Sequence, residues 1–204
     1  MQGSDIGFAP IKIDSGDDIY VISGVSGQLL KVDKNLKPLA DICTPFPALI
    51  TSSTILGNIW IGVWIERDLR QARMAALDLT DDWSNGPTKS DLRDYQSGFS
   101  LHPSSNVWSQ ILDSEPTALS QVDGSICFST INRGIYKIDG ESNEIWRAEI
   151  PKWSEIEKIN TFDEIVAFLS YEEQLVLMSK AGGFAIIDEN GNFCLLYTSP
   201  SPRD

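Results

Sequence analysis

The sequence predicts an all-β fold made of about four antiparallel units, each with four strands. Short runs rich in β-branched and aromatic residues alternate with turn sequences such as Asp123-Gly124 and Asp139-Gly140, which is the pattern of β-hairpins. A signature ending in aspartate also closes the third run of each unit, and it recurs roughly every 45 to 60 residues, near the length of a β-propeller blade. The prediction is therefore a partial β-propeller. The repeated aspartates are Asp33, Asp78, Asp139 and Asp188.

The clearest unit runs from Pro116 to Ile150, and its first strand follows a proline. Proline suits the position ahead of a strand because it has no N–H to contribute to the ladder. Pro10 stands in the same place ahead of the first unit. The strands predicted for the clearest unit are Leu119–Val122, Ile126–Thr130, Gly134–Ile138 and Glu144–Ile150.

The other units follow the same plan, with boundaries at about 5–44, 45–114, 115–151 and 152–193. In the second unit the outer strand is displaced to Ser105–Ile111, so residues 81–104 form an insertion, with one helical turn from Ser90 to Arg93. Ser154 and Glu157 form a capping-box pattern, so residues 155–159 are a helical turn or a short strand. The remaining strands are Ile11–Ile13, Asp18–Ser23, Gln28–Val32, Leu39–Cys43, Leu49–Ile55, Ile59–Ile65, Arg73–Leu77, Val166–Ser170, Leu175–Ser179 and Gly183–Ile187.

The last residues, Cys194 to Asp204, match the translation of a common transposon-type sequencing adapter. We therefore expect native sequence to end at Phe193, inside the fourth unit, where adapter-derived residues 194–204 replace the outer strand, and we exclude these residues from the fold prediction. On this interpretation residues 1–193 are a fragment of a larger propeller.

Composition excludes several classes of protein. A net charge of −13 argues against a nucleic-acid partner, because neutralising phosphates requires a basic surface. Cys43 and Cys127 fall in different units, so we expect no disulfide framework. The sequence has neither an apolar run long enough for a membrane span nor a signal sequence at its start, which predicts a cytoplasmic protein if Met1 is the true start.

The run Asp123–Ser129, followed by Gly134–Asp139 and Glu144–Trp146, resembles the repeats of quinoprotein-like (PQQ-like) and WD40-like β-propellers. The resemblance implies four-stranded blades around a central channel, commonly about seven or eight of them. Family enzymes that use pyrroloquinoline quinone carry Thr-Gly ahead of a docking tryptophan. Here Glu141-Ser142-Asn143 precedes Trp146, and Trp108 is the other corresponding tryptophan. The resemblance thus implies the architecture without a quinone site, and we predict no cofactor.

The residues whose side chains could take part in catalysis or ligand binding each have a simpler structural interpretation. His102 is the only histidine, which excludes a cluster of histidine ligands and predicts a surface-loop residue. The stretch Asp188–Asn192 resembles a calcium loop but fits a hairpin turn better, so no metal site is predicted. The repeated aspartates are expected to accept backbone hydrogen bonds in turns. Trp108 and Trp146 are expected to pack between blades rather than dock a ligand.

No set of residues in the sequence forms a recognisable catalytic constellation, so we predict a non-catalytic binding or scaffolding module. The alternative is a fragment of a propeller enzyme, a dehydrogenase or a hydrolase, whose catalytic residues lie elsewhere. Cationic residues fall in loops that should share one face of a propeller, where they would attract a protein or a small anionic ligand. The opposing interpretation is that they are ordinary solvated charges. These residues are Arg67, Arg70, Arg73, Arg133, Lys152, Lys158 and Lys180.

Overall fold

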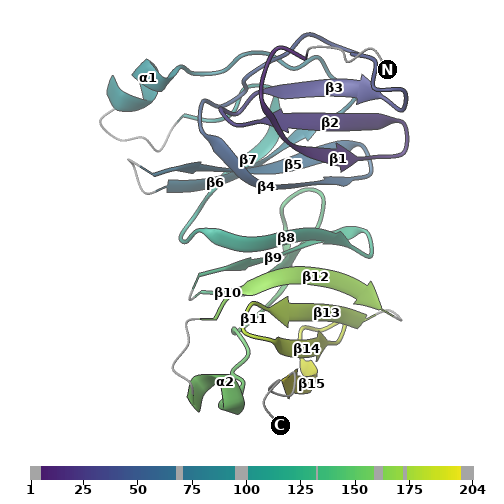
Figure 1. Ribbon diagram of the computed structural model, residues 1–204, viewed down its shortest axis with the longest axis vertical. Helices are drawn as coiled ribbons and strands as arrows, with labels where there is room; N and C mark the ends of the chain where they lie inside the picture. The colour runs from purple at the N-terminus through teal and green to yellow at the C-terminus, as the bar shows by residue number, and fades with distance from the viewer. Residues whose placement is uncertain are drawn as a thin grey trace. The chain divides into compact units, whose positions relative to one another are not determined.

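The computed structural model describes residues 6–67, 71–94, 101–131, 133–158, 163–171 and 174–198. The chain divides into two compact units, residues 1–113 and residues 114–204, and each contains two antiparallel sheets (Figure 1). The predicted all-β fold of four antiparallel sheets is confirmed.

Unit 1 begins with a three-stranded sheet in the order β1-β2-β3, formed by Pro10–Ser15, Ile19–Gly24 and Leu29–Asp33. Its second sheet has the order β4-β5-β6-β7. The short helix α1 (Lys89–Asp94) lies in the connection between β6 and β7. The strands of the second sheet are β4 (Leu49–Leu56), β5 (Ile59–Glu66), β6 (Gln71–Asp78) and β7 (Asn106–Leu112).

Unit 2 contains two four-stranded sheets, β8 to β11 and β12 to β15, in which each strand pairs with its neighbours in sequence. The short helix α2 (Ser154–Lys158) lies in the connection between them, as the helical alternative for this segment predicted. The strands are β8 (Pro116–Val122), β9 (Ser125–Thr130), β10 (Gly134–Ile138), β11 (Glu144–Ala148), β12 (Ile165–Tyr171), β13 (Gln174–Ser179), β14 (Gly183–Ile187) and β15 (Phe193–Thr198).

The repeat is visible in the strand register as well as in the sequence. The first pair of strands in every sheet shifts register near its start, for example after Pro10 in β1 and after Pro116 in β8. In three sheets the last pair shifts again immediately before the end of the third strand, as between Lys137 and Ile138. Because a bulge bends a strand and increases its twist, equivalent bulges give the sheets a common shape.

The first sheet lacks the predicted fourth strand. Residues 38–43 approach β3 but form only isolated bridges, between Leu29 and Cys43 and between Val32 and Pro38. The stretch from Leu39 to Ile42 therefore lies opposite only Leu30 and Lys31, and this excess of residues interrupts the ladder. Pro38 also has no N–H to donate.

The outer strand of the fourth sheet is formed by residues that the sequence analysis left out of the fold. β15 pairs along β14 from Phe193 to Thr198, so residues 194–198 occupy the outer position of this sheet. Leu195, Leu196 and Tyr197 are largely exposed there. The backbone of these residues pairs with the hydrogen-bonding groups at the edge of β14, even though their side chains bury little surface area. Residues 199–204 fall outside the described part of the chain.

Each unit has its own hydrophobic core between its two sheets. Middle strands such as β5 and β9 are buried on both faces. The sequence of β5 is accordingly apolar from Ile59 to Ile65 instead of alternating, whereas β9 also buries Ser125, Ser129 and Thr130. Trp60 and Trp64 of β5 are fully buried in unit 1 and meet edge to face, with ring centroids 5.5 Å apart. In unit 2 the core includes Trp146 of β11 and Trp153 ahead of α2.

The helical turn predicted in the insertion is confirmed, but it begins earlier than expected. The Thr88 hydroxyl accepts from the Asp91 N–H at 3.2 Å, and an Asp91 carboxylate oxygen accepts from the Thr88 N–H at 2.6 Å. This reciprocal pair is a capping box, so Thr88 and not Ser90 starts the helix. In α2, the Ser154 hydroxyl instead lies 3.4 Å from a carboxylate oxygen of Glu155.

The predicted role of the repeated aspartates is confirmed. One carboxylate oxygen of Asp139 accepts the backbone N–H groups of Glu141 and Asn143 at 2.9 and 2.8 Å. Asp33 and Asp188 make the same pair of bonds within equivalent turns. Asp78 instead accepts from Thr80, where the chain leaves for the insertion. The residues Asp188–Asn192 thus form a hairpin turn, closed by a bond from the Asp188 N–H to the Asn192 carbonyl at 2.9 Å.

These turns should make the fold sensitive to acid. Hydrogen bonds, chiefly from Lys37, Thr80, Asn143 and Asn192 respectively, lower the pKa of Asp33, Asp78, Asp139 and Asp188 below the ordinary value of 3.8. A carboxyl whose pKa is lower in the folded state stabilises the fold above its unfolded pKa and loses that contribution as the pH falls through the folded pKa. We expect the melting temperature to fall steeply below about pH 4.

The control is the triple variant Asp33→Asn, Asp139→Asn, Asp188→Asn, whose amides accept hydrogen bonds but do not titrate. Its melting temperature should depend less on pH between pH 7 and pH 3 than that of the wild type. Parallel curves for the two proteins, followed by circular dichroism, would show that these turns do not carry the acid response.

Candidate binding site

A cavity of about 430 Å³ lies in unit 2, where several strands begin or end. Thr117 lies near the start of β8 and Thr130 at the end of β9, and antiparallel pairing of Pro116 with Thr130 brings these ends together. The segments on either side of α2 complete the wall. The other lining residues are Ile131, Arg133, Glu149, Ile150, Lys152, Asp163, Glu164 and Ile165.

Three cations predicted for the binding rim meet at this cavity. Arg133, in the turn between β9 and β10, and Lys152, ahead of α2, both line it and are exposed. Lys180 lies beside it, because its ammonium is 2.9 Å from a carboxylate oxygen of the lining residue Glu164. Within the described residues, no ion pair engages Arg133 or Lys152. Both side chains are therefore available to a ligand.

Carboxylates line the same cavity, which the sequence analysis did not anticipate. Glu149 follows β11, and Asp163 and Glu164 immediately precede β12. Oδ1 of Asp163 accepts the backbone N–H groups of Glu164 and Ala181 at 3.0 and 2.8 Å, so the carboxylate is held in place. In the sequence, these acidic residues lie at the two ends of the long connection that carries Lys152. Their position there was the available signal that they line the same cavity. The cavity is thus of mixed charge rather than uniformly basic.

Two residues that line the cavity each have a buried polar atom that lacks a hydrogen-bond partner among the described residues. These atoms are Oγ1 of Thr130 and Oδ2 of Asp163. Thr130 is only 4% exposed, and the neighbouring hydroxyls of Thr117 and Ser129 already bond to each other at 2.8 Å. Burying a polar group without a partner costs about 1 to 3 kcal/mol. A ligand that bonds to these atoms would recover that cost.

A smaller cavity of about 170 Å³ adjoins the first and shares Ile150, Lys152, Asp163, Glu164 and Ile165 with it. Trp153 forms part of its wall and is fixed there, because its indole N–H donates to the Phe184 carbonyl at 3.1 Å. Pro151 and Ile156 add further apolar surface. The two cavities together therefore combine a polar compartment with a more apolar one.

The remaining residues of the predicted rim lie elsewhere. Arg67 is exposed in the turn after β5, and Arg70 lies outside the described residues. Arg73 is not a loop residue: it lies within β6, is 2% exposed, and places its guanidinium 5.5 Å from the Phe46 ring centroid. Burial lowers the pKa of this guanidinium. Lys158 pairs with Glu155 along α2 at 2.9 Å.

Among the comparisons with known proteins, only the comparison of structures finds similar proteins. No protein-family model and no curated protein sequence matches the chain. BamB from Moraxella catarrhalis has a similar structure, with a TM-score of 0.60 and 14% identity over 92% of this chain and 52% of that one. The β-propeller domain of Cps50 (Swd1) from Myceliophteria thermophila has a TM-score of 0.57 and 10% identity over 92% of this chain and 57% of that one. The fold is a partial β-propeller.

This propeller chain spans about half the length of BamB and of the Cps50 domain. The computationally designed Ika4 protein differs in this respect, because the similarity covers 91% of this chain and 98% of that one, with a TM-score of 0.54 and 12% identity. Sequence identities this low relate the chains by fold and carry no functional information.

The other residues whose side chains could take part in catalysis or ligand binding lie in structural positions in the propeller. His102 lies in a loop and is exposed, as predicted, with Nδ1 3.3 Å from Nη1 of Arg73. Trp146 packs as expected between the two sheets of unit 2, where its ring faces Gly191, while Trp108 is half-buried on β7. Burial raises the pKa of the Cys43 and Cys127 thiols to about 11 and about 12, so both are protonated at neutral pH.

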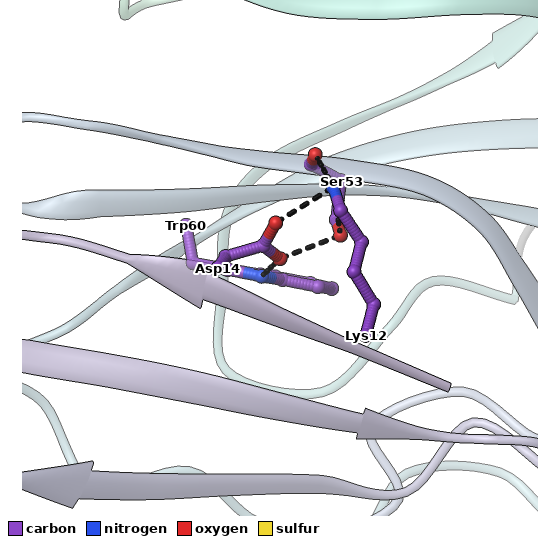
Figure 2. A network of polar contacts seen from close by, with 4 residues as sticks. All are labelled: Lys12, Asp14, Ser53 and Trp60. Atoms are coloured by element: carbon purple, nitrogen blue, oxygen red, sulfur yellow. Dashed lines mark hydrogen bonds and ion pairs between the residues drawn. The ribbon is translucent and has the colours of Figure 1, made fainter. Parts of the chain in front are cut away.

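Unit 1 contains a buried polar network centred on Asp14, which joins its two sheets (Figure 2). One carboxylate oxygen of Asp14 lies 2.7 Å from the Lys12 ammonium. The other accepts the Ser53 hydroxyl at 2.5 Å and the Trp60 indole N–H at 2.7 Å. Lys12 also donates to the Ser53 backbone carbonyl. Because every polar atom drawn has a partner, the network connects β1 to β4 and β5 rather than presenting a site for a ligand.

Within the described ranges, no group of three or more His, Cys, Asp or Glu side chains is arranged to hold a metal ion. No helix in this part of the chain is long and apolar enough to cross a membrane.

Proposed function

We propose that this chain is a non-catalytic propeller module that binds a ligand or partner protein through an acidic group, at the cavity of unit 2. Arg133 and Lys152 would contact that group. The observation that carries the proposal is the meeting of two exposed cations, neither of which forms an ion pair with any described residue, at a concave site in a chain of net charge −13.

The cavity has the dimensions and lining of a small-ligand site. Its volume of about 430 Å³ falls within the range of about 300 to 1,000 Å³ that is usual for such sites. Ile131, Ile150 and Ile165 provide apolar surface between the charged groups. A binding role is favoured over a catalytic one because the Thr117 hydroxyl bonds to Ser129 and not to a base that could activate it.

We further propose that residues 1–193 belong to a larger propeller and that residues 194–204 derive from an adapter. The lengths of BamB and the Cps50 domain are consistent with this proposal. On the alternative view, that the whole protein is an enzyme, its catalytic residues lie in the part beyond this chain. The genomic reading frame after the Phe193 codon is the observation that decides both points.

Charge reversal at the cavity should weaken binding of an acidic probe. We expect the double variant Arg133→Glu, Lys152→Glu to bind a fluorescent peptide of alternating glutamate and leucine at least roughly tenfold more weakly than the wild type, because it loses charged hydrogen bonds. Fluorescence anisotropy at low and moderate salt measures this, and wild-type binding should weaken as salt increases.

Lys158→Glu is the matched control, because Lys158 is also an exposed cation of the predicted rim but lies outside the cavity lining. Its affinity for the peptide should remain close to that of the wild type. Equal affinities for the wild type and the double variant would remove the cavity as the binding site.

A further inference from the structure

The charges at the cavity of unit 2 match a ligand that carries both signs. Arg133 and Lys152 form no ion pair within the described part of the chain, but Glu149 and Asp163 line the same walls. Glu164 is already neutralised by Lys180 at 2.9 Å. A purely anionic ligand would therefore approach two carboxylates without compensation, and like charges at close range weaken binding.

The unpartnered atoms support the same conclusion. Oδ2 of Asp163 is buried without a partner in the described part of the chain, while Oδ1 is held by two backbone N–H groups. A fixed, desolvated carboxylate oxygen is an acceptor for a positively charged donor. Thr130 adds a buried hydroxyl that can donate or accept. An ammonium group on the ligand satisfies Asp163, and a carboxylate satisfies Arg133 and Lys152.

The adjoining cavity indicates the chemical character of the rest of the ligand. Its walls include Pro151, Trp153 and Ile156, which provide an apolar surface suited to an aliphatic side chain. Two compartments of about 430 and 170 Å³ provide more space than one amino acid requires. We infer that the cavity binds a short zwitterionic peptide with aliphatic side chains, its ammonium at Asp163 and its carboxylate at Arg133 and Lys152. This inference rests on the proposed binding function of the same cavity.

Blocking each charged end of a dipeptide separately tests the inference. The probes are leucyl-leucine, N-acetyl-leucyl-leucine and leucyl-leucine amide, measured by isothermal titration calorimetry. The wild type should bind the unblocked dipeptide at least roughly tenfold more tightly than either blocked form, because each block removes a charged hydrogen bond. Asp163→Asn should lose the discrimination against the acetylated form only, and Arg133→Gln the discrimination against the amide only.

Two variants protect the test from a folding artefact. Glu149→Gln removes a carboxylate from the cavity wall without touching the backbone bonds of Asp163, and it should also reduce the preference for a free amine. Glu141→Gln, an exposed residue in the turn after β10, should bind all three probes as the wild type does. Thermal unfolding of each variant confirms that it is folded.

The outcomes separate the two proposals. If the wild type binds the acetylated and unblocked dipeptides equally, and Arg133→Gln weakens both, the cavity binds carboxylates but the zwitterion inference is wrong. If the acidic peptide binds independently of Arg133 and Lys152 and no dipeptide binds, both proposals fail.

Discussion

Replacing Asp14 with alanine is expected to lower the free energy of unfolding of unit 1 by about 3 kcal/mol. The carboxylate is the common acceptor for Lys12, Ser53 and Trp60. Its loss would leave the fully buried indole N–H of Trp60 without a partner and remove the hydrogen bond from β1 to β5, while Lys12 still bonds to Ser53 of β4. The Lys12 side chain is 45% exposed and can turn to water, which limits the cost to the lower end of the range for buried ion pairs.

Urea denaturation followed by tryptophan fluorescence measures this loss. Asp18→Ala is the control, because Asp18 is exposed and should change stability by less than about 0.5 kcal/mol. Asp14→Asn retains acceptor capacity without the charge and should fall between the two. If Asp14→Ala were as stable as Asp18→Ala, the network would contribute nothing to the fold.

Replacing Trp64 with alanine is expected to destabilise unit 1 by about 4 kcal/mol, the usual cost of removing a fully buried tryptophan. The ring is completely buried and packs edge to face against Trp60 and Phe46, with centroids 5.5 and 6.4 Å away. Its indole N–H has no partner among the described residues, so packing accounts for the whole contribution.

Because the indole N–H of Trp64 has no partner among the described residues, a phenylalanine variant can be compared with the alanine variant to isolate the contribution of ring packing. Trp64→Phe removes the unpartnered N–H and keeps an aromatic ring, so it should lose less than half as much stability as Trp64→Ala. Tyr171→Ala, at a largely exposed aromatic ring of β12, should change stability by less than about 0.5 kcal/mol. Equal losses for the alanine and phenylalanine variants would mean that ring packing is not what Trp64 contributes.

The sequence by itself determined the features that depend on local chemistry. Asp123-Gly124 forms the predicted tight turn with φ values of 48° and 70°, because few residue pairs other than Asn-Gly and Asp-Gly tolerate two successive positive φ angles. The repeated aspartates cap their turns for a similar reason, since donor and acceptor are only two to four residues apart. The strands were predictable because hairpins pair residues that are close in sequence.

Only the tertiary structure decided which side chains meet across the sheets. The buried guanidinium of Arg73 lies over the ring of Phe46, which belongs to the segment before β4. The network of Asp14 depends on Ser53 and Trp60, about 40 residues away or more. The carboxylates at the cavity were missed for the same reason. Glu149 and Asp163 belong to segments on either side of α2, and only the packing of two sheets brings them to Arg133. Such contacts follow from the free energy of burying whole strands, which a local sequence pattern does not encode.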